Sequence, residues 1–407
     1  MDSKYFTHVL KNGLRILHVP TDSQVAYCGM AVNAGSRDEV SGKFGLAHFV
    51  EHTIFKGTKH RRAWHILNRM ERVGGELNAY TTKEGTMLYS IFPCEHFQRA
   101  IELLADLIAN SQFPASELQR EREVVMDEVN SYRDTPSEAV YDDFEDLLFA
   151  GSLLGHNILG IENDVKNLSS DDCRDYIDRL YVPENMAFFV MGNLSTERVF
   201  QMAEKYLGVL NHGINRIQRI APEAITPFRQ SINIDAHQAH TVVGTQIFNM
   251  YDERRFAMSL LNNIIGGPGM NSMFNVAIRE RRGYAYTVES SATLMTDCGL
   301  FEIYFGSDEQ NVNRCLKLIG NIIDNLATKS LGDKALDAAK KQYIGQLRVA
   351  NDNNESLAMS IGKSFLYFDR ISSTEEISER IMALSASDIM DAAALITMPR
   401  CSILTMK

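Results

Sequence analysis

The order of the elements that the sequence predicts repeats once along the chain, and this repeat constrains the fold more than any other feature. A strand-like run, a helix, a hairpin and a series of helices fill residues 5–210, and the same order returns over 230–407. The letters repeat as well, since Asn78-Ala79-Tyr80-Thr81 matches Tyr284-Ala285-Tyr286-Thr287 at an offset of 206 residues. We therefore predict the α+β class, with two duplicated domains of about 200 residues, each a mostly antiparallel β-sheet packed with α-helices.

The segment 211–229 separates the two repeats. It contains Pro222 and Pro227 and shows little periodicity, which is typical of a linker. We expect a first domain over 1–210, this linker, and a second domain over 230–407.

Composition and charge exclude several classes of function. The chain has 407 residues with 41 Lys and Arg against 52 Asp and Glu, and its acids are spread along it, which argues against nucleic acid as a partner. No apolar run reaches about 18 residues, so we expect no membrane span. Because the N-terminus has no signal core and the six cysteines form no Cys-x-x-Cys pair, we expect a cytoplasmic protein without disulfides or a thiolate metal site.

One short segment of the first domain concentrates the chemistry. Lys43–Phe55 is expected to be a helix that ends at Gly57, and it carries two histidines and a glutamate at His48, Glu51 and His52. Residues three and four apart lie on one face of a helix, so these three side chains share a face. In this His-x-x-Glu-His order the two imidazoles can bind one metal ion while the glutamate stays free for acid/base work.

A third metal ligand is expected from a later helix, predicted over 117–132. Glu128 is our predicted third ligand, and Glu121, two turns earlier on the same face, would hold a ligating imidazole in its correct tautomer. From the residues alone, Glu121, Glu123 and Asp127 remain open as alternatives for the third ligand.

Two neutral histidines and one carboxylate suit a catalytic zinc ion, one per chain, whose bound water can approach a pKa of about 7. Glu51 would take a proton from the attacking water and pass it to the departing amine, so the predicted reaction is amide hydrolysis. Plain structural explanations compete with this one. A histidine on a helix is usually a half-buried polar residue, and the acidic stretch over 117–128 could be a solvated helix face.

Further motifs extend the pattern beyond the two helices. They are Gly45-Leu46-Ala47-His48-Phe49-Val50-Glu51-His52, Phe55-Lys56-Gly57-Thr58, Leu77-Asn78-Ala79-Tyr80-Thr81, Glu121-Arg122-Glu123-Val124-Val125-Met126-Asp127-Glu128, Gly266-Gly267 and Arg279-Glu280-Arg281-Arg282-Gly283-Tyr284-Ala285-Tyr286. Together they resemble the signature of the insulinase or pitrilysin superfamily of zinc metallopeptidases (family M16), closest to its processing-peptidase-like branch with two-domain subunits. The resemblance covers essentially the whole chain.

The resemblance implies roles for the residues already singled out. His48, His52 and Glu128 are similar to the family's zinc ligands. Glu51 is similar to its catalytic base, and Glu121 to its supporting acid. Residues 1–210 would therefore be the zinc-bearing catalytic domain.

The resemblance also implies how a substrate would be held. Arg279 and Tyr286 are similar to the family's pair that reaches the substrate carbonyl, although a surface arginine and a core tyrosine are the plainer explanation. The edge strand along which substrates lie corresponds to Asn78, Ala79, Tyr80 and Thr81. An unpaired strand edge binds an extended peptide through main-chain hydrogen bonds, but these residues could equally form one more strand of the sheet.

In this family two half-shells enclose a chamber, and a two-domain subunit supplies one of them. The second domain, 230–407, would be a homologous domain without metal that completes the chamber. Because this chain carries both the zinc motif and Arg279 with Tyr286, we expect a homodimer in which that pair completes the site of the opposite subunit. A closed chamber favours short or unfolded peptides as substrates.

Two other functions remain open at the level of sequence. The chain could be a catalytically silent assembly subunit, although such relatives have typically lost a ligand or the base. It could also be a dedicated peptidase that processes one precursor or presequence, and the motifs cannot separate this function from general peptide cleavage.

Overall fold

The structure is a computed structural model that describes residues 5–211, 213, 217–234 and 236–407. Residues 1–4 of the predicted first domain, 212 and 214–216 of the predicted linker and 235 of the predicted second domain lie outside the described residues. The chain divides into two compact units. Unit 1 comprises 1–129, 156–219 and 350–373, and unit 2 comprises 130–155, 220–349 and 374–407.

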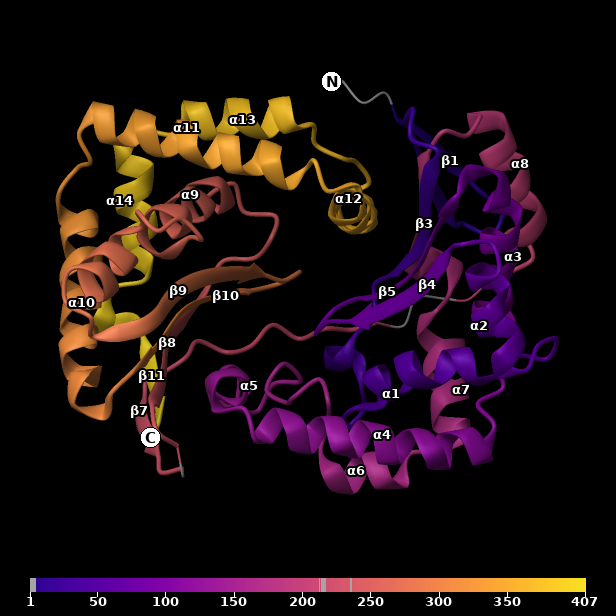
Figure 1. Cartoon of the computed structure of the whole chain (residues 1–407), viewed down its shortest axis with the longest axis horizontal. Helices are drawn as coiled ribbons and strands as arrows, with labels where there is room; N and C mark the ends of the chain where they lie inside the picture. The colour runs from indigo at the N-terminus through magenta and orange to yellow at the C-terminus, as the bar shows by residue number, and fades with distance from the viewer. Residues whose placement is uncertain (1–4, 212, 214–216, 235) are drawn as a thin grey trace. The chain divides into compact units, whose positions relative to one another are not determined.

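Unit 1 is built on a six-stranded sheet in which every neighbouring pair is antiparallel except β2 and β6, which are parallel. In order across the sheet the strands are β1 (Phe6–Val9), β2 (Arg15–Pro20), β6 (Met186–Gly192), β3 (Val25–Val32), β5 (Thr86–Pro93) and β4 (Glu76–Thr81). Strand β4 therefore forms one edge of the sheet (Figure 1).

Helices cover both faces of this sheet because its strands are apolar on both sides. The helices of unit 1 are α1 (Leu46–Thr53), α2 (Ala63–Glu71), α3 (Phe97–Asn110), α4 (Ala115–Arg133, which runs on beyond Val129 into unit 2), α6 (Glu162–Asn167), α7 (Ser170–Leu180), α8 (Thr196–Tyr206) and α12 (Asn354–Phe368). Alternate residues of β6 show the two faces, since Phe188 packs in the core with α3 and α8, whereas Phe189 packs with α12. Figure 1 shows α3 and α8 on one side of the sheet and α12 on the other.

Unit 2 repeats this sheet without the first strand. Its order is β7 (Arg229–Ile232), β11 (Ser402–Met406), β8 (Ala239–Ile247), β10 (Gly299–Ser307) and β9 (Ala285–Leu294). Only β7 and β11 are parallel, just as only β2 and β6 are in unit 1. The strands follow one another along the chain in the same way, which confirms the two duplicated α+β halves with mostly antiparallel sheets.

Helices of unit 2 also lie on both faces of its sheet. They are α5 (Pro136–Leu148), α9 (Arg255–Gly266), α10 (Val312–Thr328), α11 (Asp333–Ala350), α13 (Thr374–Ala383) and α14 (Ala386–Leu395), with a π-helical turn, η5 (Asn275–Glu280). The core beneath α9, α10 and α14 contains Val243 and Phe301, whereas Val242 and Leu300 on the opposite face pack against α5.

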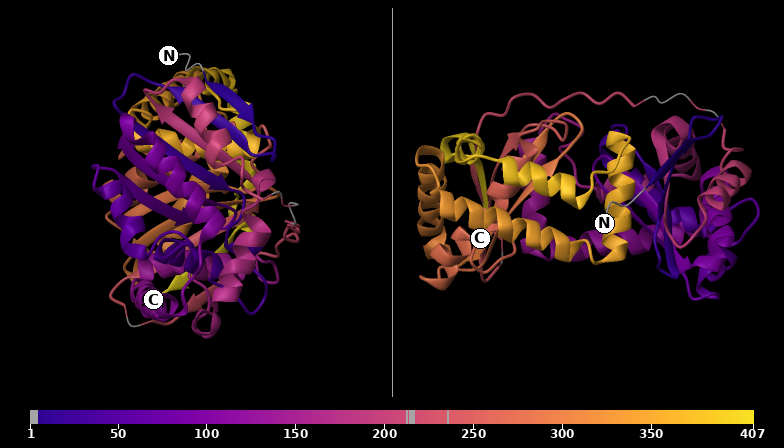
Figure 2. Two further views of the ribbon diagram at one scale, coloured as in Figure 1. Left: turned by 90° about the vertical axis from the view of Figure 1, so that its right-hand side faces the viewer. Right: turned by 90° about the horizontal axis from the view of Figure 1, so that it is seen from above.

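Two helices, α5 and α12, each pack against the sheet that the other half of the sequence forms. Helix α5 belongs to the first half of the sequence but covers β8 and β11 of unit 2, and α12 belongs to the second half but covers β3 and β6 of unit 1. The sequence predicts one division of the chain, within 211–229, and does not anticipate these two exchanges. The described residues of that segment form neither helix nor strand before Arg229 (Figure 2).

Candidate metal centre

Helix α1 presents the His-x-x-Glu-His motif because its apolar face is fully committed to the core. Leu46, Phe49 and Val50 are buried in the core of unit 1, so the remaining face carries the two histidines and Glu51. The helix begins three residues later than predicted. Gly45 adopts the left-handed conformation, with φ at 95°, and a residue in this conformation cannot continue an α-helix towards Lys43.

Three side chains converge at one point. The Nε2 atoms of His48 and His52 are 3.2 Å apart, and Oε2 of Glu128 lies 3.7 Å from the first and 3.4 Å from the second. All three ligand atoms lie within 4.8 Å of one another, and among the described residues no other group of three or more His, Cys, Asp or Glu side chains meets this condition. The structure thus brings together the three predicted ligands, whereas Glu123 and Asp127 lie outside the group.

Glu121 fixes the orientation of one imidazole. Its Oε1 lies 3.1 Å from Nδ1 of His52, and its Oε2 lies 2.7 Å from Nζ of Lys56. When Nδ1 donates its proton to this carboxylate, Nε2 of His52 presents a lone pair towards His48 and Glu128. Glu121 is therefore placed to support the metal site, as the sequence predicts, although its role stays a prediction.

The donor set fits a zinc ion. Burial, with a smaller effect of the neighbouring His52, lowers the pKa of His48 to about 3, so this imidazole is neutral at physiological pH, as a metal ligand must be. A neutral Nε2 lone pair on His52 and a carboxylate oxygen directed at one point repel each other unless a proton or a cation lies between them. Two imidazoles and one carboxylate form a ligand set typical of catalytic zinc.

Glu51 lies beside this group but not within it. Burial raises the pKa of Glu51, and the nearby Glu128 adds to this increase, whereas the hydroxyl and backbone of Thr81 and the neighbouring His52 oppose it. Thr81 is the last residue of β4, and helix α1 contacts that strand. Glu51 is thus a partly desolvated carboxylate between the metal group and an edge strand, which suits a general base.

The predicted substrate strand is the edge strand β4. Asn78, Ala79, Tyr80 and Thr81 are all partly exposed, and β4 pairs with β5 on one side only. The structure thus provides the free strand edge that peptide binding requires, but the binding itself stays a prediction.

Arg279 and Tyr286 belong to unit 2, and both occupy irregular backbone. Arg279 lies on the π-helical turn η5. Tyr286 lies at a β-bulge of the edge strand β9, where Gly306 pairs with Thr287 but Ser307 pairs with Ala285. Such irregularities frequently redirect side chains at functional sites.

The two residues of this pair lie close together. Both line one cavity of about 160 Å³ that includes Gly267 and Met270. Tyr286 is 62% exposed, so the alternative of a core tyrosine is wrong.

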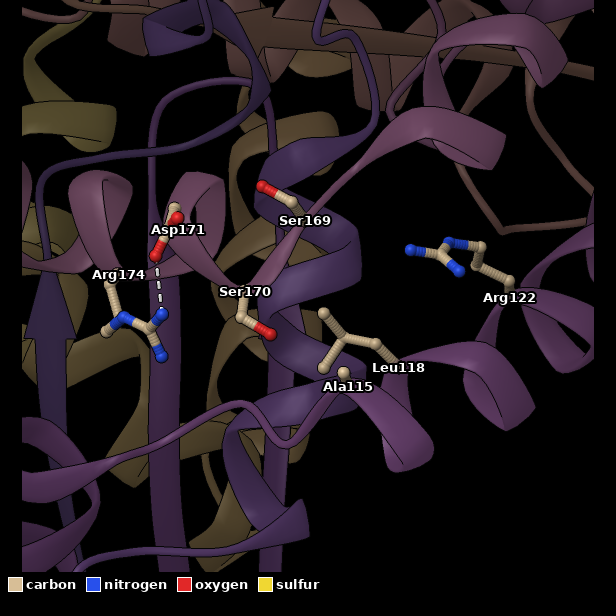
Figure 3. A pocket seen from close by; sticks show the side chains of 7 residues that line it. All are labelled: Ala115, Leu118, Arg122, Ser169, Ser170, Asp171 and Arg174. Atoms are coloured by element: carbon tan, nitrogen blue, oxygen red, sulfur yellow. Dashed lines mark hydrogen bonds and ion pairs between the residues drawn. The ribbon is translucent and has the colours of Figure 1, made fainter.

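One cavity of unit 1 contains none of the predicted site residues (Figure 3). It measures about 280 Å³ and lies at the starts of α4 and α7, where Arg174 forms an ion pair with Asp171.

Three residues near the site have no counterpart among the sequence predictions. Lys56 pairs with Glu121, whereas Glu39 accepts backbone N–H groups at the start of α1 and contacts His156. The sequence does contain a signal for such an acceptor. The residue before the short motif helix is a glycine, which has no capping side chain, so the first N–H groups of the helix need an acceptor from elsewhere in the chain.

All six cysteines are free and buried. No helix among the described residues is long and apolar enough to cross a membrane.

Comparison with known proteins gives consistent results. The family model described as insulinase (peptidase family M16) matches residues 15–160, and the model described as peptidase M16 inactive domain matches 167–343. An uncharacterized zinc protease of Rickettsia bellii is 32% identical over 97% of this chain and 95% of its own length. An uncharacterized zinc protease of Bacillus subtilis is 30% identical over 93% of this chain and 92% of its own length.

Solved structures share the fold. A protease from Helicobacter pylori superposes with a TM-score of 0.91 at 20% identity, over 100% of both chains. A peptidase M16 inactive domain from Pseudomonas fluorescens superposes with a TM-score of 0.92 at 18% identity, over 99% of this chain and 97% of that chain. Because the family model matches and a relative of 32% identity covers 97% of this chain, the chain belongs to the insulinase family of peptidases, M16.

Proposed function

We propose that this protein is a zinc-dependent endopeptidase that hydrolyses short or unfolded peptides, with one zinc ion per chain. The observation that carries the proposal is the convergence of His48, His52 and Glu128 beside a partly desolvated Glu51. The names of the relatives support it, since they are called zinc proteases.

His48, His52 and Glu128 would hold the metal, with Glu121 orienting His52. A zinc ion bound there supplies a Lewis acid for hydrolysis of an amide. Glu51 then accepts a proton from the attacking water and donates it to the amide nitrogen, so that a C–O bond forms, the C–N bond breaks and a neutral amine leaves. The raised pKa of Glu51 favours the first of these transfers, because it makes the carboxylate a stronger base towards the attacking water.

The substrate would lie along the free edge of β4 as an added strand. Main-chain hydrogen bonds to Asn78–Thr81 would place the scissile amide beside Glu51, which itself lies next to Thr81. Arg279 and Tyr286 would donate hydrogen bonds to the carbonyl oxygen as negative charge develops on it. We propose that they act on the site of the second subunit of a homodimer.

The test is to measure the zinc content of the purified protein together with its cleavage of a quenched fluorescent peptide. The wild type should contain one zinc ion per chain and cleave the peptide. Glu51→Gln should keep the zinc and reduce kcat by about 100-fold or more, because the proton acceptor is lost while the ligands remain. His48→Ala should lose both zinc and activity, and a wild type without zinc would contradict the proposal.

A catalytically silent subunit is the second candidate, and one observation favours it. The family model that matches 167–343 is described as an inactive domain. However, that description concerns the half without the metal group, and all four residues of the proposed zinc and base set lie in the other half. Zinc binding without cleavage of any peptide would favour the silent subunit, and cleavage of one precursor only would favour a dedicated processing peptidase.

A further inference from the structure

The metal helix α1 begins without a cap of its own. It has only eight residues, and its N-cap residue, Gly45, has no side chain to accept hydrogen bonds from the first turn. A helix this short is unstable in isolation, so its position depends on contacts from the rest of the protein. His48 lies in the first turn, where fraying would move a ligand directly.

A carboxylate from an earlier loop takes the place of the cap. Oε2 of Glu39 accepts the N–H of Gly45 at 2.9 Å, and Oε1 accepts the N–H of Ala47 at 2.7 Å. The side chain of Glu39 is completely buried, so these bonds form in a low-dielectric interior where they are strong. The two carboxyl oxygens also lie at the positive end of the helix dipole.

A buried histidine holds this carboxylate in place. Nε2 of His156 lies 3.0 Å from Oε2 of Glu39, and the imidazole stacks on the ring of Phe44 with centroids 4.1 Å apart. The backbone at Gly160 also approaches the backbone at Phe44 closely, because a Cβ on Gly160 would lie 2.2 Å from the carbonyl oxygen of Phe44. The segment around 156–160 is therefore packed directly against the residues that lead into α1.

We infer that Glu39, held by His156, is a positioning residue that fixes the start of α1 and thereby the geometry of the zinc ligands. Ala47, whose N–H Glu39 binds, directly precedes His48, so the carboxylate acts one residue from a ligand. Metal ligands need to be held to within about 0.5 Å, and outer groups that orient them typically change metal affinity by about 10–100-fold. This inference rests on the proposed function, because it assumes that His48, His52 and Glu128 bind zinc.

The test is the zinc affinity of Glu39→Gln, measured by competition with a chelating indicator. An amide can accept only one of the two backbone N–H groups and turns a donor towards the other, so the zinc Kd should rise by about 10-fold or more. In the zinc-loaded protein kcat should fall while KM stays unchanged, because β4 is not touched. The matched control is Glu84→Gln, which removes a buried carboxylate that pairs with Arg37 in the same unit. It should lower the Tm but leave the zinc Kd within about twofold.

A second pair of variants covers the case in which Glu39→Gln does not fold. His156→Ala removes the donor to Glu39 and should weaken zinc binding, whereas His156→Gln, whose amide can donate in its place, should restore much of the affinity. Unchanged zinc affinity in folded Glu39→Gln, or in His156→Ala, would overturn the inference. If the wild type bound no zinc at all, the proposed function itself would fail, and this outcome is distinct.

Discussion

At the scale of single residues, environment separates side chains of the same kind into different roles. Glu51 and Glu128 are both carboxylates near the two histidines, but only Glu128 belongs to the metal group, whereas Glu51 lies beside it. The sequence leaves four acids open as the third ligand, and the structure brings only Glu128 into the group with the histidines. The periodicity of a helix defines which acids share a face, but not which of them a distant helix will meet.

The choice of third ligand can be tested on one helix. Glu128→Ala should abolish stoichiometric zinc binding, because two imidazoles alone leave the site with too few ligands. The control is Glu123→Ala, which removes an exposed acid of the same helix and should leave the zinc content unchanged. Equal zinc loss in both variants would show that the structure assigns the wrong acid.

A second prediction at this scale concerns stability and pH. His18 on β2 is fully buried, and burial lowers its pKa to about 4 from the ordinary 6.5, against a smaller opposing effect of the Gly192 backbone. The unfolded chain therefore binds more protons between these two values, so the contribution of His18 to stability is complete above pH 6.5 and is lost as the pH falls towards 4.

The experiment compares the wild type with His18→Gln, which keeps a polar group near Thr196. Between pH 7 and pH 5 the free energy of unfolding of the wild type should fall by about 2 kcal/mol more than that of the variant. Urea unfolding of both proteins at the same zinc content measures this difference, so that the titration of His48 cancels. Parallel pH profiles would contradict the assignment.

At the scale of elements, local patterns predict the long helix α4 but miss three helices in the last part of the chain. Helix α4 (Ala115–Arg133) is confirmed close to its predicted bounds of 117–132. Helices α12, α13 and α14 are absent from the sequence predictions. In α12 the buried positions 358, 361, 362 and 365 follow a helical spacing, so the signal for this helix was present.

Helix α12 supports a prediction about packing. A Cβ on Gly362 would lie 2.6 Å from the ring of Phe189, whereas a Cβ on Gly345 in the interior of α11 would meet no atom within 4 Å. Gly362→Ala should therefore destabilise unit 1 by about 1–3 kcal/mol through overpacking. Gly345→Ala should stabilise its helix by about 0.5–1 kcal/mol. Thermal unfolding measures both, and a rise in Tm for Gly362→Ala would show that the sheet face and α12 are not packed this closely.

At the scale of the whole molecule, the segment 130–155, which carries α5 in unit 2, begins and ends next to residues of the candidate metal centre or of its supporting contacts. The chain leaves unit 1 directly after Val129, next to the ligand Glu128, and returns at His156, which holds Glu39. The residues at which the chain re-enters unit 1, beginning with His156, thus supply part of the packing around α1. A break in the loop before His156 should for this reason disturb zinc binding as well as unit 2.

The proposed homodimer gives the prediction at this scale. A His48→Ala chain and an Arg279→Ala chain are each expected to be inactive. If Arg279 and Tyr286 act on the partner's site, a mixed dimer contains one intact site, and subunit exchange should restore up to about a quarter of the wild-type activity. Different affinity tags on the two chains would verify that mixed dimers form, and no recovery in verified mixed dimers would show that the pair does not act across subunits.

The sequence alone determined the duplicated α+β architecture and the metal-binding face of α1, because both depend on local periodicity and on residues a few positions apart. Only the tertiary structure decided that Glu128 meets the histidines, that Glu39, in contact with His156, caps α1, and that α5 and α12 change units. These contacts join residues that are far apart in the chain, such as Glu39 and His156, which are 117 positions apart. Their choice depends on which surfaces pack most favourably after collapse, and no short-range pattern encodes that outcome.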